Sequence, residues 1–172
     1  MAELTPQERL QPALLDRLTD EEPTNRKPEP REQRVITKRK LREAVLRDLV
    51  WLFNTTRLAS GDELSGFPYA ERSVINFGLP ALSGETASTL DVIDLEAGIR
   101  QAIIDFEPRI DPSTLEVETI VSGERMDNHN LVGLQIRGQL WAEPVRLDLL
   151  LRTEVDLETG NVLIRDLAKS GM

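Results

Sequence analysis

The sequence of 172 residues is long enough for one compact domain with a tail, and its formal net charge of −9 argues against a nucleic-acid partner, which needs clustered lysine and arginine. The chain has no cysteine, which excludes disulfides and thiolate metal sites. It shows no signal-peptide pattern and no apolar stretch near the roughly 18 residues that span a bilayer, so we expect a cytoplasmic protein without direct membrane insertion.

The first apolar segment is short and lies near the N-terminus. Residues 10–18 read LQPALLDRL, and Leu14, Leu15 and Leu18 would share one face of a helix. A helix this short is marginal in water by itself. We therefore expect it to dock, either on its own domain or on a partner.

A charged segment follows. Residues 20–34 contain three prolines and few apolar side chains. Such a composition buries too little apolar surface to offset the entropy of ordering, so we expect a mobile linker. The sequence thus predicts a docking segment and linker over residues 1–36 and a domain over residues 37–168.

The domain begins with an amphipathic segment. Thr37 suits the N-cap of a helix over residues 38–53. Its apolar residues recur with helical spacing, with Leu46, Val50 and Phe53 beside a main stripe formed by Leu41, Val45, Leu49 and Leu52.

Two further helices are expected before residue 110. Pro68 suits the first turn of a second helix, which Gly78 would close and in which Val74, Ile75 and Phe77 are the apolar residues. Asp91 or Asp94 would cap a third helix, which should end near residue 107 because proline follows there. Its apolar positions are regular: Leu95, Ile99, Ala102, Ile103 and Phe106.

The remaining sequence alternates between apolar and polar residues, as strands do. Strands are expected over residues 115–121, 131–141, 145–155 and 162–164, with a tight turn over residues 158–161. Consecutive strands with short connections predict an antiparallel meander. The expected fold is α+β, with the N-terminal helices packed on one face of the meander.

Side chains that carry catalytic chemistry are few. The lone histidine, His129, lies in a polar stretch between two expected strands, and no phosphate-binding glycine loop or nucleophile elbow is present. We expect no metal and no cofactor. The best local acid is Glu107, but Arg109 two residues away would keep it ionised, whereas a general acid must hold a proton.

Several segments occur in an order that resembles a known family. The tripeptide Glu107-Pro108-Arg109, between an amphipathic helix and a β meander, resembles the EPR motif of the "lysozyme-like" phage baseplate wedge family and of the TssE family of type VI secretion systems. Further matches are LLDRL at 14–18, LREAV at 41–45, LFNTTR at 52–57, SVINFGLP at 73–80, GQLW at 138–141 and EVDLETG at 154–160.

The resemblance implies a structural subunit of a contractile baseplate and no catalytic role. The implied wedge partners are TssF, TssG and TssK, which Glu107, Pro108 and Arg109 would contact. The implied sheath partners are TssB and TssC, with which the sheet edge near residues 145–164 would pair. The implied location is the cytoplasmic side of the cell envelope, in the baseplate.

Two other classes of function stay open on the residues alone. One is a lysozyme-like enzyme that cleaves peptidoglycan, because acidic pairs are inevitable among 30 acidic residues. The other is a free regulatory binding module on the same fold. Turnover of cell-wall glycan would distinguish the first, and binding to a soluble regulator in cells without a sheath would distinguish the second.

Overall fold

A computed structural model describes residues 13–18, 37–59, 64, 66–81, 91–120, 131–141 and 146–167. The linker expected over residues 20–34 and the loop that contains His129 lie outside these residues. No helix in the described ranges is long and apolar enough to cross a membrane.

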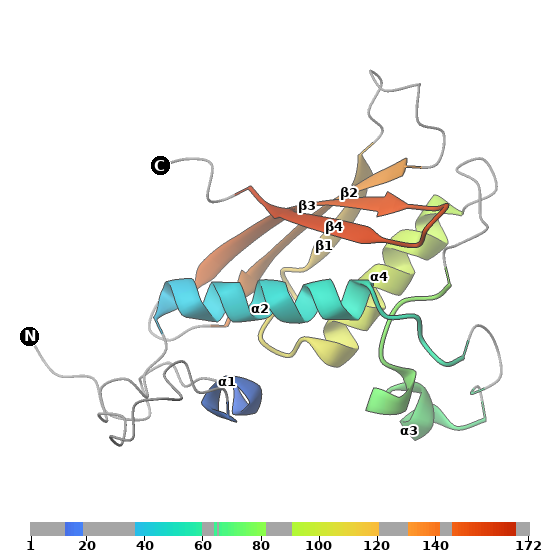
Figure 1. Cartoon of the computed structure of the whole chain (residues 1–172), viewed down its shortest axis with the longest axis horizontal. Helices are drawn as coiled ribbons and strands as arrows, with labels where there is room; N and C mark the ends of the chain where they lie inside the picture. The colour runs from blue at the N-terminus through green and yellow to red at the C-terminus, as the bar shows by residue number, and fades with distance from the viewer. Residues whose placement is uncertain are drawn as a thin grey trace, which may run out of the picture.

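The fold is α+β, as the sequence predicted, with helices preceding a four-stranded antiparallel sheet. Figure 1 shows the sheet as one layer, with α2 and α4 together on one of its faces. The elements are α1 (Leu14–Leu18), α2 (Lys38–Phe53), α3 (Pro68–Glu71), the 3-10 helix η3 (Val74–Asn76), α4 (Val92–Phe106), β1 (Glu116–Ile120), β2 (Leu131–Leu140), β3 (Leu147–Asp156) and β4 (Val162–Asp166).

The strands form a simple meander in the order β1-β2-β3-β4. Alternate residues of β2 and β3 are buried, and the register places Ile136 opposite Leu151 at the centre of the inner face. Charged residues such as Arg152 lie on the other face. The core therefore lies between the inner face and the two long helices, as the period-two pattern predicted.

Helix α2 begins where the sequence predicted. The Thr37 hydroxyl accepts a hydrogen bond from the backbone N–H of Lys40 over 3.2 Å, which satisfies one of the unpaired donors of the first turn. The predicted stripe is buried, and its members are Leu41, Val45, Leu49 and Leu52. Val50, at the margin of that stripe, remains 38% exposed.

The second predicted helix is not continuous. It begins at Pro68 as expected but stops after Glu71, and a separate 3-10 turn follows. The Ser73 hydroxyl accepts a hydrogen bond from Ile75 N–H and so competes with helical continuation. Val74 and Ile75, predicted as apolar contacts of this helix, are instead exposed.

Gly78 ends this region in a conformation that favours glycine, with φ of +127°. A Cβ atom there would lie 2.2 Å from the carbonyl oxygen of Thr55. The close approach is held by hydrogen bonds from Leu79 N–H to Thr55 C=O and from Arg57 N–H to Leu79 C=O, each 2.8 Å long. Gly78 thus joins the segment after α2 to the segment before α4.

Helix α4 places the turn of interest at its C-terminal end. Asp91, one of the two predicted caps, accepts hydrogen bonds from the backbone N–H groups of Ile93 and Asp94. The helix ends at Phe106, and Glu107 is its C-cap. This boundary agrees with the prediction from Pro108.

Candidate docking site at the Glu107–Arg109 turn

In the turn after α4, Arg109 binds the carboxylate of Glu107, two residues before it. The Arg109 guanidinium donates from Nε to Glu107 Oε1 over 2.6 Å and from Nη2 to Glu107 Oε2 over 2.5 Å. The Arg109 backbone N–H also donates to Glu107 Oε1 over 3.2 Å. Pro108 between them is exposed and restricts the backbone, so the carboxylate and guanidinium meet as a planar, two-point pair.

A residue of α2 completes this pair. Arg109 Nη2 donates to Asp48 Oδ2 over 2.5 Å, across 61 residues of sequence. Burial disfavours the charged form of Arg109, but the hydrogen bonds and charges of Glu107 and Asp48 outweigh it and raise the pKa of Arg109 above its usual value. The guanidinium is therefore held charged and oriented by two carboxylates.

The same charges continue to α1. Arg47 donates from Nε to Asp48 Oδ1 over 2.8 Å and from Nη1 to Asp16 Oδ1 over 2.7 Å. Its guanidinium also lies 5.3 Å from the ring centroid of Trp51, within range of a cation–π contact. A chain of alternating charges thus joins α1, α2 and the turn, and we call it the ion-pair network: Asp16, Arg47, Asp48, Arg109 and Glu107.

Burial separates this pair from an ordinary surface ion pair. Glu107 is only 2% exposed. The pair is therefore not an exposed salt bridge at a helix end, since the Arg109 side chain is also only 21% exposed. A buried carboxylate that two arginine nitrogens engage is suited to orienting the guanidinium and has no free oxygen facing solvent for acid catalysis.

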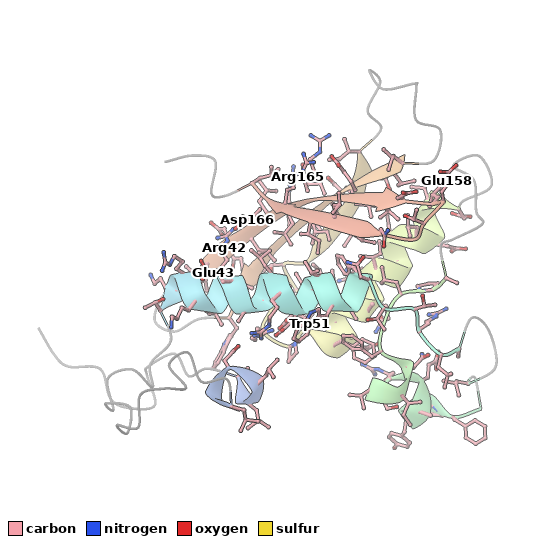
Figure 2. The ribbon with its side chains drawn as sticks, in the orientation of Figure 1. Arg42, Glu43, Trp51, Glu158, Arg165 and Asp166 are labelled. Carbon is pink, nitrogen blue, oxygen red and sulfur yellow. The ribbon has the colours of Figure 1, made fainter. Side chains whose placement is uncertain are left out.

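An apolar groove of about 530 Å³ lies beside the turn. It runs between α1 and the turn, over α2 and the end of α4. Figure 2 shows Trp51 on the side of α2 that faces away from the sheet. The apolar residues that line the groove are Ala13, Leu15, Leu49, Trp51, Leu52, Phe77, Phe106 and Pro108.

The second predicted contact surface is the β4 edge, and α2 partly occupies it. The Asn54 side chain donates to Val162 C=O over 3.0 Å and accepts from Val162 N–H over 3.0 Å. At the other end of β4, Arg42 binds Asp166 with two nitrogens. Figure 2 shows Arg42 and Asp166 pointing toward each other.

These contacts establish which backbone groups of β4 face outward. Val162 turns its N–H and C=O to Asn54, while Leu167 N–H bonds back to Leu150 C=O. Hydrogen-bonded and non-bonded pairs alternate along an antiparallel ladder. The backbone N–H and C=O of Ile164 therefore point away from β3, like those of Val162, whereas the backbone N–H and C=O of Leu163 point toward β3.

The structure thus brings together the three site residues that the sequence named, Glu107, Pro108 and Arg109, in one turn. It adds two contributors that the sequence analysis did not single out: Asp48 of α2 and Asn54 at the C-cap of α2. No local signal could have found either role, because their partners lie 61 and 108 residues away in the sequence.

Comparison with known proteins gives one family. Searches of curated proteins and of solved structures each returned no match. The sequence profile of the family described as "Baseplate wedge protein gp25" matches residues 39–145, more than half of the chain. The range contains all of α2 after Lys38, all of α4 and the Glu107–Arg109 turn. The chain therefore belongs to the baseplate wedge protein gp25 family.

Proposed function

We propose that the protein is a non-catalytic structural subunit of a type VI secretion baseplate, of the TssE kind, which links the wedge to the first ring of the contractile sheath. It would act on the cytoplasmic side of the envelope, with TssF, TssG and TssK as wedge partners and TssB and TssC as sheath partners. Family membership supports a structural baseplate role.

The observation that carries the wedge contact is the orientation of Arg109. Two carboxylates, Glu107 and Asp48, hold its guanidinium beside an apolar groove. Such preorganisation reduces the entropy that an arginine loses on binding. The guanidinium and the groove together form a surface with an oriented hydrogen-bond donor beside apolar side chains, and protein interfaces combine these two features.

Arg109 also has a donor left to offer. Its Nη1 atom is buried and has no hydrogen-bond partner among the described residues. A buried unpaired donor is costly, but because Nη1 is buried, an acceptor from a wedge partner would reach it only if the turn shifts on binding. The turn would then contribute affinity through one short-range polar contact.

The sheath contact would use the edge of β4. An exposed edge offers backbone hydrogen bonds to an added strand. Because Asn54 already bonds Val162, the outward groups of Ile164 are the central ones for such an addition. The protein would thus present two surfaces, one at the end of α4 and one at the sheet edge.

The test is co-purification of the wedge with Arg109→Lys and Arg109→Ala variants, together with a titration that gives the dissociation constant. Lysine keeps a positive charge beside Glu107 and Asp48, but its ammonium group cannot reproduce the planar set of donors of a guanidinium. We expect Arg109→Lys to stay folded and to bind the wedge at least about tenfold more weakly, because losing a buried interfacial charge contact costs about 2 to 5 kcal/mol.

Thermal melts of each variant alone separate binding from folding. Arg109→Ala leaves Glu107 buried without its cation, so it should destabilise the free protein by about 3 to 5 kcal/mol. The conclusion therefore rests on the lysine variant, compared with wild type at a temperature where both are folded. Unchanged affinity of folded Arg109→Lys would rule out the wedge contact at this turn.

A further inference from the structure

The outer face of the sheet, which is turned away from α2 and α4, carries three neighbouring arginines. Arg152 of β3 lies directly opposite Arg165 of β4, and Arg137 lies two residues beyond the β2 position opposite Arg152. All three alternate with buried positions of their strands. Figure 2 shows Arg165 directed away from α2, whereas Asp166 points toward it. We call Arg137, Arg152 and Arg165 the arginine band.

The band is not neutralised within the chain. Like charges that lie directly opposite one another on a sheet repel, and Arg152 and Arg165 form such a pair. Arg165 Nη2 is 3.5 Å from Glu154 Oε2, but the Arg165 side chain stays 64% exposed. Arg152 forms no ion pair and no hydrogen bond with a described residue, and of its three nitrogens only Nε is buried. The terminal nitrogens of Arg152 are therefore open to an anion from solvent.

A glutamine holds the third guanidinium near this pair. Gln135 of β2 lies directly opposite Arg152. In the amide orientation that satisfies its neighbours, the side-chain oxygen of Gln135 accepts hydrogen bonds from Arg137 Nε over 2.6 Å and from Arg137 Nη2 over 2.5 Å. Arg137 is thus directed toward the strand position that faces Arg152. An anion above Gln135 would meet guanidinium groups from two strands.

Acidic residues on the same face limit which anion fits. Glu118 lies opposite Gln135, and Glu116 lies opposite Arg137, both on β1. A long polyanion such as a nucleic acid would meet these carboxylates as well as the net charge of −9. A short segment that carries one or two carboxylates avoids that repulsion, and a guanidinium binds a carboxylate through two parallel hydrogen bonds. The band is therefore suited to an acidic side chain of a protein.

We propose that the arginine band binds an acidic segment of the sheath subunit whose strand adds to β4. The band reaches that edge because Arg165 lies on β4 itself, so the side chains of an added strand come within cross-strand distance of it. Leu163, two residues before Arg165, is on the same outer face and is 61% exposed. The added strand should carry an acid opposite Arg165 and an apolar residue opposite Leu163. This inference rests on the proposed sheath contact and adds the side-chain chemistry that selects the strand.

The test is a titration of the TssB–TssC complex with the full chain carrying Arg152→Gln or Arg152→Glu. We expect affinity to fall by about fivefold for glutamine and further for glutamate, and the differences to shrink as ionic strength rises. The matched control is Arg39→Gln, which makes the same charge change at a 78% exposed side chain on α2. The melting temperature of Arg152→Gln should not fall, because the substitution removes the like-charge neighbour of Arg165.

A second variant should act with the opposite sign. Glu118→Gln removes a carboxylate from the same face and should strengthen sheath binding, a gain that a purely structural role of this face does not predict. The third variant is Ile164→Pro, which removes a backbone donor of the β4 edge and leaves the arginine band in place.

The outcomes separate this inference from the proposed function. Wild-type affinity of Arg152→Glu alongside lost binding of folded Ile164→Pro would overturn the inference and leave the proposed sheath contact standing. Wild-type affinity of both variants would overturn the sheath contact itself. Duplex DNA that binds the wild type but not Arg152→Glu would replace the acidic segment with a nucleic acid.

Discussion

The side chain of Asn54 pairs with the backbone of Val162 as a neighbouring strand would. It donates to the carbonyl and accepts from the N–H, each over 3.0 Å, just after the end of α2. A second bond from Asn54 Nδ2 to Val50 C=O fixes the amide to its own helix. The first residue of the edge strand is thereby tied to the helix that packs beneath it.

Replacing Asn54 should loosen this tie. Asn54→Ala removes both hydrogen bonds to Val162, and we expect it to lower the free energy of unfolding by about 1 to 3 kcal/mol. Asn54→Asp is the matched control, because it can still accept from Val162 N–H but cannot donate to the carbonyl. Urea denaturation should rank wild type above aspartate and aspartate above alanine. Equal stability of all three would show that solvent replaces the amide without cost.

The proposed sheath contact predicts a position-specific effect of proline on β4. Ile164→Pro removes an outward N–H and should block strand addition, so sheath assembly should fail. Ile164→Ala controls for lost packing and should assemble. Proline at the neighbouring Leu163 would instead break the ladder to β3 and unfold the edge. Normal assembly with a folded Ile164→Pro variant would remove strand addition at this edge.

Two glycines should respond to alanine with opposite signs. Gly78→Ala places a Cβ atom 2.2 Å from Thr55 C=O and forces a φ of +127°, so we expect a loss of about 3 kcal/mol or more in unfolding free energy. Gly98→Ala on α4 meets no heavy atom closer than 4.0 Å and should stabilise the helix by roughly 0.5 to 1 kcal/mol. Calorimetric melting of both variants checks the prediction, and a mild effect at Gly78 would contradict it.

Asp156 predicts a pH dependence of the β3–β4 turn. Hydrogen bonds from the Thr159 hydroxyl and from the backbone N–H groups of Glu158 and Thr159 lower the pKa of Asp156 below its usual value. Because the folded-state pKa is the lower one, the stabilisation is complete above the unfolded pKa of about 3.9 and is lost as the pH falls through the folded-state value.

The measurement is chemical denaturation of wild type and Asp156→Ala at pH 7 and near pH 3. The alanine variant should be the less stable protein at pH 7, and the difference should shrink in acid. Thr159→Ala, which removes the hydroxyl donor, should give a smaller loss with the same pH trend. A difference between wild type and Asp156→Ala that is independent of pH would show that the carboxylate charge contributes nothing.

The purified protein should have no muramidase activity. Glu107 is buried and engaged by Arg109 through both carboxylate oxygens, so it cannot deliver a proton to a glycosidic oxygen. The assay is release of soluble product from peptidoglycan, with an active lysozyme as the positive control. Cleavage that disappears in a folded Glu107→Gln variant would reinstate the enzymatic alternative.

The sequence alone was sufficient for the elements whose signals are local. Helical periodicity predicted α2 and α4 to within a residue or two, and alternation predicted the inner faces of β2 and β3. The caps Thr37 and Asp91 were readable for the same reason, because a cap binds N–H groups within three residues of itself. Consecutive strands with short turns then left the antiparallel meander as the natural topology.

Signals failed where two local preferences competed. Pro68 and Gly78 bounded a segment with apolar residues, which suggested one helix, yet Ser73 turns its hydroxyl to the backbone and the helix stops. Asn76 is then buried, where it accepts from Ala59 N–H and donates to Glu71 C=O. These contacts exist only once the chain has folded back on itself, so tertiary packing overrides the local pattern.

The site shows the same division. Sequence order placed Glu107, Pro108 and Arg109 in one turn, because a proline after an amphipathic helix ends it there. Only the tertiary structure decided that Asp48 shares the guanidinium and that Asn54 covers Val162, because contacts across 61 and 108 residues depend on how the helices lie against the sheet. The sequence around a charged residue on a helix surface does not indicate its distant partner. The two residues come together only because burial of the core packs their elements against each other.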